Sequence, residues 1–431
     1  MIHQSDELKR AIGLPGAVLM GLGSIIGTGI FVSIAIGTQI AGNGIVIAIL
    51  IAGILAIFNG LSSAQLAAAH PVSGGTYEYG YKFLNSYLGF SAGWMFLIAK
   101  SASAATAVLG CIGYLFYTLN LGVDQRLIII SGLILLFIMT YLVSGGISRS
   151  NLANKIIVGI TLVGLICLIA VATGVEGLPV DGVFAASTDV SIDKILYASA
   201  LMFVAYTGYG RIATLGEEVK NPEKTIPRAI ITAMGLIVLI YLMVTLTAIH
   251  VMGVEEFGKT IDGEAAPLVK VAEVLNIPFV KGIVALAAIT AMLGVLLNLI
   301  LGLSRVMLSM ARRGDVPNGI ANIRQKDQSP VRAVWFTAAI IALLVLSGNV
   351  VFTWSFSAFT VLIYYSITNL AALFLPVKKR LYPRWVAFAG MFSCIFLAFW
   401  IDPFVWMLGL GVLVAGLIWH YFADFLKKKR T

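Results

Sequence analysis

The amino-acid sequence predicts an all-α integral membrane protein with twelve transmembrane helices. Of its 431 residues, 59% are hydrophobic and only 11% are charged, and the mean hydropathy is +0.97. Soluble domains carry about 25% charged residues. Many apolar stretches reach about 20 residues, which is the length that crosses a bilayer as a helix. The alternating segments of about ten residues that are typical of a membrane β-barrel do not occur.

Twelve apolar segments are separated by polar or turn-forming residues. Asp402-Pro403 reads as a tight turn between the last two, which would otherwise fuse. We expect membrane spans at residues 14–40, 43–69, 88–119, 127–146, 152–174, 192–215, 227–252, 280–308, 331–349, 352–376, 385–401 and 403–425.

The distribution of Lys and Arg fixes the expected orientation. With these spans, 23 of the 29 basic residues fall on the side of the N-terminus, five fall on the other side, and Lys100 falls within a span. Cytoplasmic loops are rich in Lys and Arg, so we expect a multi-pass protein of the cell membrane with both termini in the cytoplasm. The net charge of +9 then reflects topology and contact with anionic lipid, and nucleic-acid binding is not needed to explain it.

The polar residues exclude several function classes. Cys111, Cys167 and Cys394 lie in apolar segments at unrelated spacings, and the four histidines are scattered, so we expect no disulfide, metal site or cofactor. The phosphate-binding sequence of ATP-driven pumps does not occur. A membrane enzyme would need clustered His, Asp or Glu within the spans, and none are present.

The first span contains three glycines within seven residues, Gly23, Gly27 and Gly29. Each glycine weakens a helix by about 0.5–1 kcal/mol relative to alanine. Unpaired backbone groups are tolerated in the bilayer only where protein or a wet cavity receives them. The pattern therefore predicts a broken helix whose bare N–H and C=O groups form a binding site near the middle of the membrane.

The sixth span contains a second pair of glycines, Gly208 and Gly210. The two broken spans are five spans apart and enter the membrane from opposite sides, which indicates an inverted repeat. We therefore divide the chain into a cytoplasmic N-terminus (1–13), a first repeat of spans one to five (14–176), a second repeat of spans six to ten (190–376), two further spans (385–425) and a cytoplasmic C-terminus (426–431).

Four stretches, in order along the chain, carry a resemblance to a known family. They are GSIIGTGIF (23–31), AAAHPVSGGTY (67–77), YTGYG (206–210) with EEVKNPEKTIPR (217–228), and SRVMLSMARRGDVP (304–317). Together they resemble the signatures of the amino acid–polyamine–organocation (APC) permeases. The resemblance implies a leucine-transporter-type fold, in which two inverted five-helix repeats with discontinuous helices 1 and 6 precede two extra helices. It also implies secondary transport of an amino acid by alternating access.

The two breaks together suit a zwitterion. The N–H groups that open the second half of span one, near Gly27, can bind a carboxylate, and the carbonyls that end the preceding half-helices can bind an ammonium group. Tyr206 stands where the family places an aromatic gate over the substrate. The predicted substrate-binding residues are Ser24, Ile25, Ile26, Gly27, Thr28, Gly29, Phe203, Val204, Ala205, Tyr206, Thr207 and Gly208.

Lys100 lies well inside the third span, about 18–20 Å from the start of the helix at 1.5 Å per residue. An intramembrane charge is costly unless it is paired, neutral or in a wet cavity. Some relatives carry a lysine on span five in place of a sodium ion, and the matching residue here is Thr161. We hypothesise that Lys100 supplies this cation and couples transport to protons. The alternatives are a fixed structural charge, or sodium held by span-one carbonyls and hydroxyls such as Thr290.

The expected substrate is a neutral amino acid, because spans one, three, six, eight and ten carry no Asp or Glu near their midpoints. The expected coupling ion is a proton, with sodium as the alternative. A sodium-independent exchanger and a cationic amino acid or polyamine transporter remain open, as does the choice between monomer and homodimer. A nutrient sensor is a distant alternative, because no extended cytoplasmic tail follows residue 430.

Overall fold

In the computed structural model, the described residues are 12–70, 74–122, 124–145, 151–177, 191–213, 219–263, 265–324 and 329–428. This described part is helical, and its β-structure is limited to two isolated bridges, Ile12 with Val219 and Arg324 with Ser329. The predicted cytoplasmic ends lie largely outside the described residues.

The helices follow one another along the chain with short connections. They are α1 (Leu14–Ile25), α2 (Ile34–Ala41), α3 (Ile45–Ala69), α4 (Thr76–Phe83), α5 (Ser86–Thr118), α6 (Gln125–Ser144), α7 (Asn151–Glu176), α8 (Ile192–Tyr206), α9 (Gly210–Ala213), α10 (Pro222–Met252), α11 (Val254–Lys259), α12 (Pro267–Val274), α13 (Pro278–Arg313), α14 (Val331–Val345), α15 (Val350–Leu373), α16 (Arg384–Ala398) and α17 (Pro403–Lys428).

Eight helical runs in the described residues are long and apolar enough to cross a membrane, and three shorter apolar helices accompany them. One run, Gly29–Ala69, has 41 residues. At 1.5 Å per residue it would be roughly 60 Å long, about twice the hydrocarbon thickness. A 3-10 turn at Gly42–Gly44, with Gly42 at φ 53°, divides it into α2 and α3. The multi-pass helical architecture is thus confirmed, while the count of twelve spans and the inverted repeat stay predictions.

Two connections contain helices that the sequence pattern did not predict. Helix α4 lies in the expected loop between spans two and three, and α11 and α12 lie in the expected loop between spans seven and eight. Each has only six or eight residues. Helices this short are not stable by propensity and form because their buried faces pack on neighbours. Here α4 packs on α5, α11 on α2 and α12 on α13.

Polar side chains define where several long helices begin. Asn85 accepts a hydrogen bond from the Leu88 N–H (2.9 Å) at the start of α5, and Asn349 does the same for the Phe352 N–H (2.9 Å) at the start of α15. These side chains satisfy N–H groups that have no partner within their helix. At the far end of α13, Gly314 adopts the left-handed conformation (φ 78°) that stops the helix.

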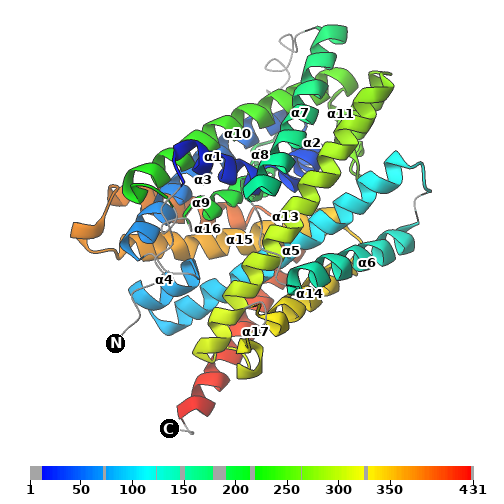
Figure 1. The fold of residues 1–431 in the computed structure, drawn as a ribbon. Helices are drawn as coiled ribbons and strands as arrows, with labels where there is room; N and C mark the ends of the chain where they lie inside the picture. Colours follow the sequence, from blue (N-terminus) through cyan, green and yellow to red (C-terminus); the bar gives the residue numbers. More distant parts are fainter. Residues whose placement is uncertain are drawn as a thin grey trace.

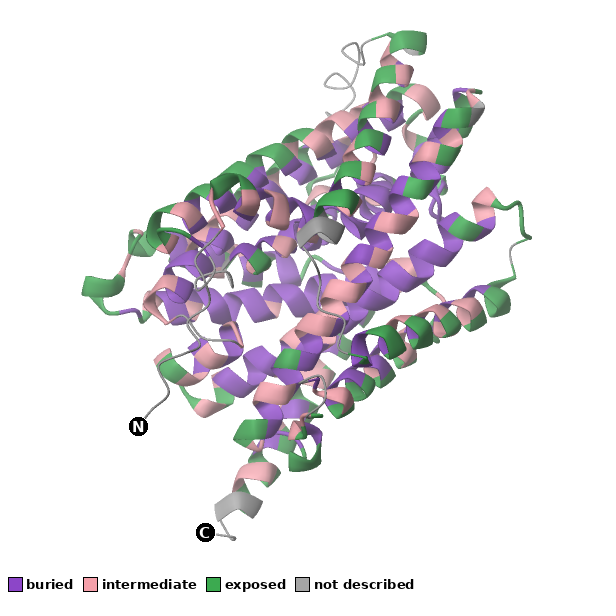
Figure 2. Ribbon diagram, viewed as in Figure 1, coloured by how far each residue is buried: buried purple, intermediate pink, exposed green. Residues whose placement is uncertain are grey.

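Helix α5 crosses the centre of the molecule, where it packs on α15, α13, α14 and α17 (Figure 1). Figure 2 shows α5 buried over most of its length. The outer helix α6 instead exposes an apolar stripe that includes Ile130, Ile134, Phe137 and Tyr141. This spacing of three to four residues is one face of a helix, and its apolar character suits contact with lipid.

Hydroxyl groups join α5 to α15 across the centre. The Ser103 and Ser357 hydroxyls lie 2.7 Å apart, and Thr106 donates to Thr353 (2.8 Å). Ser357 also contacts the Ala99 carbonyl (3.0 Å). Small side chains let the two backbones approach closely, and the hydrogen bonds satisfy each hydroxyl in a region without water.

Asp315 forms a buried polar cluster where α13 ends. Its Oδ2 accepts hydrogen bonds from the Tyr77 and Tyr81 hydroxyls of α4, both at 2.7 Å. Its Oδ1 lies 3.6 Å from Nδ1 of His420, and its main-chain oxygen accepts from the Trp419 indole (2.8 Å). Since Trp419 and His420 belong to α17, the cluster ties the last helix to α4 and α13 on the predicted cytoplasmic side.

Burial and the neighbouring Asp315 carboxylate raise the pKa of Tyr77 and Tyr81 above its ordinary value, so both phenols stay protonated donors at neutral pH. Arg313 covers this cluster. Its guanidinium lies 4.1 Å from the centre of the Tyr81 ring and forms an ion pair with Glu78 (2.5 Å).

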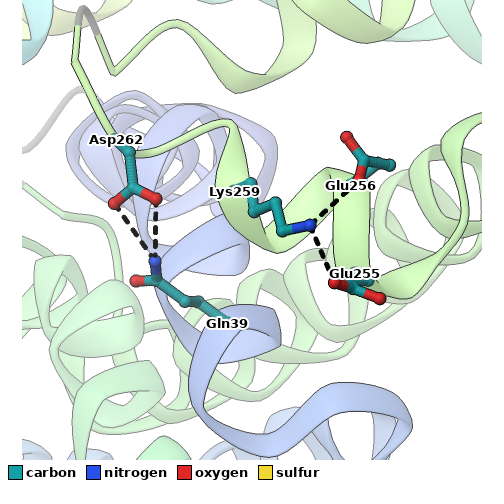
Figure 3. A network of polar contacts seen from close by, with 5 residues as sticks. All are labelled: Gln39, Glu255, Glu256, Lys259 and Asp262. Carbon is teal, nitrogen blue, oxygen red and sulfur yellow. Dashed lines mark hydrogen bonds and ion pairs between the residues drawn. The ribbon is translucent and has the colours of Figure 1, made fainter.

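A second set of polar contacts lies at the other end of the molecule, around α11 (Figure 3). The Gln39 amide at the end of α2 donates to the Asp262 carboxylate (3.2 Å), and Lys259 pairs with Glu255 (2.7 Å) and Glu256 (3.1 Å). The Glu255–Lys259 pair is largely exposed, so it adds little to stability. The Gln39–Asp262 contact instead joins the α11–α12 connection to the second half of span one.

We predict that Asp315→Asn destabilises the protein by about 1.5–3 kcal/mol, the typical value of a buried hydrogen bond to a charged group. The purified protein should melt at a lower temperature in detergent. Glu255→Gln is the matched control, because it also removes one carboxylate charge but from an exposed ion pair. Equal melting temperatures for the two variants would contradict the structural role of Asp315.

Candidate functional site

The first apolar segment is interrupted between α1 and α2. Helix α1 ends at Ile25, and Ile26 turns to an extended conformation (φ −73°, ψ 111°) while its N–H still bonds to the Leu22 carbonyl (2.8 Å). Helical bonding resumes with the Ile30 and Phe31 N–H groups, which both donate to the Gly27 carbonyl (3.1 and 3.2 Å). A π-helical turn, Gly29–Ser33, then leads into α2.

The N–H groups of Gly27, Thr28 and Gly29 therefore come before Ile30 and Phe31, whose N–H groups are the first to bond within the new helix. The opening N–H groups of a helix have no carbonyl partner within it, and together they form a positive pole. All three residues are buried.

The sixth span is distorted less than the first. Helix α8 passes at Tyr206 into a 3-10 turn, Thr207–Tyr209, and continues as α9. The Val204 carbonyl accepts the Thr207 N–H and the Thr207 hydroxyl (2.8 Å), and the Ala205 carbonyl accepts the Tyr241 hydroxyl (3.0 Å). We expected the carbonyls that end this half-helix to bind an ammonium group, but these two already accept from the protein and keep only their remaining acceptor capacity for a ligand.

The two distorted segments touch each other directly. A Cβ added at Gly208 would collide with the Ser24 carbonyl oxygen and would lie 2.7 Å from the Ile25 nitrogen. A Cβ added at Gly29 would collide with the Tyr241 hydroxyl and would lie 2.8 Å from the Ala205 Cβ. Gly208 thus permits backbone-to-backbone contact between the end of α1 and the turn after α8, and Gly29 permits close approach of the second half of span one to α8 and α10.

Tyr241 of α10 is a residue of this site that the sequence pattern did not reveal. Its side chain is fully buried, and its hydroxyl lies between Gly29 and Ala205. The residue sits in the middle of an ordinary apolar span, so no local motif distinguishes it from a core tyrosine. Only the tertiary contact between span seven and the two distorted segments identifies it.

Lys100 reaches the second distorted segment. Its ammonium group donates to the Thr207 hydroxyl (2.9 Å), and the Tyr365 hydroxyl donates to the Thr207 carbonyl (3.3 Å). The lysine thus bonds to a hydroxyl of span six and not to a carbonyl of span one. Within the part of the chain that the structure describes, no carboxylate forms an ion pair with Lys100.

The aromatic residues of the site occupy different sides of α8. Tyr206 is fully buried, donates to the Ile49 carbonyl of α3 (3.1 Å) and lies against Tyr241. Phe203 meets Tyr365 edge to face, with ring centres 5.7 Å apart. In this conformation Tyr206 is therefore anchored to α3, and its role as a gate stays a prediction.

Thr161 and Thr290 lie on neighbouring helices, α7 and α13, which run in opposite directions (Figure 1). A Cβ on Gly164 would collide with Ala287, so this register brings positions 161 and 290 to one level. Each hydroxyl donates to its own helix, Thr161 to the Ile157 carbonyl (2.8 Å) and Thr290 to the Leu286 carbonyl (2.7 Å). Their oxygens keep acceptor capacity.

The first break packs on α13 as well, since a Cβ on Gly27 would meet Val295 and Ala291. Lys100 lies instead at the turn of span six. Among the described residues, no hydrogen bond joins Lys100 to Thr161 or Thr290. Of the three predicted coupling residues, Lys100 is thus attached to span six, while the Thr161 and Thr290 hydroxyls each bond within their own helix.

The Gly208 contact yields a prediction with a matched control. We expect Gly208→Ala to reduce folded protein or transport at least tenfold, because its Cβ would meet backbone atoms that cannot rotate away. Gly210→Ala adds the same methyl group two residues later, where the nearest atom is the Tyr365 hydroxyl at 3.5 Å. This control should behave like the wild type in melting temperature and uptake. Equal behaviour of the two variants would contradict the close approach of the two segments.

Comparison with known proteins identifies the family. The amino acid permease family profile matches residues 16–428. An uncharacterized transporter of Mycobacterium tuberculosis is 36% identical over 394 residues, which are 91% of this chain and 87% of the relative. The branched-chain amino acid permease BcaP of Bacillus subtilis is 31% identical over 354 residues, which are 78% of this chain and 75% of BcaP. The serine/threonine exchanger SteT of the same organism is 26% identical over 88% of this chain and 86% of SteT.

The first apolar segment of this helical membrane protein breaks at a glycine sequence, and the profile matches almost the whole length of the chain. The chain therefore belongs to the amino acid permease family, part of the APC superfamily, and is a transporter of amino acids and not an enzyme.

Proposed function

We propose that this transporter carries neutral amino acids by alternating access, that the substrate binds at the two distorted segments, and that Lys100 couples transport to protons. The observation that carries the proposal is the direct contact between the end of α1 and the turn after α8, with the Lys100 ammonium group bonded to that turn.

A zwitterion matches the poles that meet at this contact. The amides of Gly27, Thr28 and Gly29 suit a carboxylate, because they open a helix whose dipole is positive at that end. The Ser24 carbonyl, close to Gly208, is among the last of the preceding helix, and it suits an ammonium group. One bound amino acid would satisfy both poles without any charged side chain.

The charge around the site favours a neutral substrate. Helices α1, α5, α13 and α15 contain no Asp or Glu, and α8 contains only Asp193 in its first turn. Lys100 adds a positive charge when it is protonated. Two positive charges about 7 Å apart repel by about 2 kcal/mol at an effective dielectric constant of about 20. A substrate with a cationic side chain would therefore bind less well than a neutral one.

The surroundings of Lys100 support coupling to protons. A lysine that has only a neutral hydroxyl as its described partner gains no ion-pair energy from being charged. Its proton can therefore leave when the site opens to the side of lower proton concentration. The relative BcaP is named a branched-chain amino acid permease, and this supports a neutral substrate.

An exchange mechanism is the second candidate, because the relative SteT is named a serine/threonine exchanger. Uptake of labelled amino acids into proteoliposomes separates the two. We expect a pH gradient, acidic outside, to drive net uptake of neutral amino acids into vesicles that contain no amino acid. Uptake that requires internal amino acid and ignores the pH gradient would establish exchange. Uptake that requires sodium would move the coupling site to Thr161 and Thr290.

Lys100→Gln should abolish the dependence of uptake on the pH gradient and lower the initial rate at least tenfold, because glutamine is a polar side chain that carries no exchangeable charge. Lys259→Gln makes the same change at an exposed ion pair and should leave uptake unaltered. The measurement is the initial rate at several external pH values. An unchanged pH profile in Lys100→Gln would rule out the coupling role.

A further inference from the structure

The turn between α15 and α16 concentrates positive charge. Residues 374–385 include the 3-10 turn Val377–Lys379 and carry four cations and no acid. The four cations are Lys378, Lys379, Arg380 and Arg384. The turn directly follows a span, on the side of the membrane that the charge distribution assigns to the cytoplasm.

No anionic side chain in the described part of the molecule compensates these four charges. Some basic residues elsewhere are paired, such as Arg313 with Glu78 and Lys281 with Glu273. Arg380 is the least exposed of the four. Its Nη2 contacts the Leu373 carbonyl at the end of α15 (3.4 Å), and its Nε is buried without a hydrogen-bond partner among the described residues. Since Nε is enclosed, an added anion would reach this guanidinium through Nη1, which has no hydrogen-bond partner among the described residues and is not enclosed.

Large apolar side chains are exposed among the cations. Val377 is 75% exposed, Phe374 64% and Trp385 60%, and the Trp385 ring meets Phe58 of α3 edge to face. Cations alternating with apolar and tryptophan side chains suit the boundary between headgroups and acyl chains. A soluble anion such as a nucleotide would neutralise the charge but would leave these apolar side chains in water.

We propose that this turn binds the headgroup of an anionic phospholipid, while Phe374, Val377 and Trp385 insert among the acyl chains. The lipid phosphate would accept hydrogen bonds from the Arg380 guanidinium and from the ammonium groups of the neighbouring lysines, which attract phosphate as compact positive charges. Each basic residue near an anionic membrane surface strengthens binding to it. Lipid binding at this turn would require neither the substrate nor the coupling ion.

The bound headgroup would act on the helix that carries part of the transport site. Arg380 contacts the carboxyl end of α15, and Tyr365 of the same helix contacts Thr207. Asn369, one turn from Tyr365, donates to Asn59 of α3 (2.6 Å) and so fixes α15 against α3. An anion bound to Arg380 would hold the guanidinium in place against the Leu373 carbonyl at the end of α15.

The experiment measures lipid binding directly. The full-length protein is purified, equilibrated with phosphatidylcholine and phosphatidylglycerol at a 7:3 ratio, and analysed by native mass spectrometry. We expect phosphatidylglycerol to be enriched on the wild type. The variant K378Q/K379Q/R384Q should lower its apparent affinity at least tenfold. The control K220Q/K224Q/R228Q removes the same charge from another loop of the same predicted side and should retain the enrichment.

Equal binding of the two phospholipids by the wild type would overturn the proposal, and so would an equal loss in both triple variants. Displacement of phosphatidylglycerol by 10 mM inorganic phosphate would assign the site to a soluble anion and would also overturn it. Should the triple variant fail to fold, the single variants Lys378→Gln and Lys379→Gln, both at exposed positions, give the same test. Each should weaken the enrichment about threefold, and wild-type affinity in both would refute the proposal.

Discussion

The contact between two interrupted helices determines the arrangement of the centre of this protein. The backbone of Gly208 lies against Ser24 and Ile25, so the end of one helix meets the distorted turn of another without a side chain between them. Helix ends expose polar backbone groups, and the bilayer offers them no water. Bringing two such ends together is therefore favourable only because protein groups or a ligand satisfy them. Tyr241 and Thr207 already satisfy two carbonyls of span six, whereas the amides that open the second half of span one come before the first donors of the new helix, Ile30 and Phe31.

The surrounding helices hold this contact with neutral hydrogen bonds. The Ser103–Ser357 and Thr106–Thr353 pairs align α5 with α15, and the Trp354 indole donates to the Leu201 carbonyl of α8 (3.1 Å). Helix α5 in turn presents Lys100 to Thr207. Charged pairs are instead placed at the two ends of the molecule, where water reduces the cost of a charge.

Much of the fold could be predicted from the sequence, because a membrane span is a local pattern. The expected segments 88–119 and 352–376 correspond to α5 and α15, with limits that differ by one to three residues. The glycine sequence near Gly27 likewise marks the position where the first segment is interrupted, since the low helix propensity of glycine is a local property.

The remaining features depend on contacts between distant residues and have no local signal. The position of the Tyr241 hydroxyl, the attachment of Lys100 to Thr207, and the shared acceptor Asp315 each join residues that are far apart in the sequence. The short helices α4 and α11 are also determined by packing on their neighbours. The glycines of span six indicate a distortion, yet the pattern does not reveal that a 3-10 turn keeps its carbonyls occupied.

The Asp315 cluster has a consequence for how the chain is assembled. Its carboxylate and its phenolic donors belong to α4 and to the end of α13, but its histidine and indole belong to α17. Synthesis proceeds from the N-terminus, so this carboxylate is complete about a hundred residues before its last partners leave the ribosome. Until α17 inserts, the Asp315 cluster lacks its histidine and its indole. The final helix therefore completes the cluster, and a chain that stops short of it would lack the indole donor to the Asp315 main-chain oxygen.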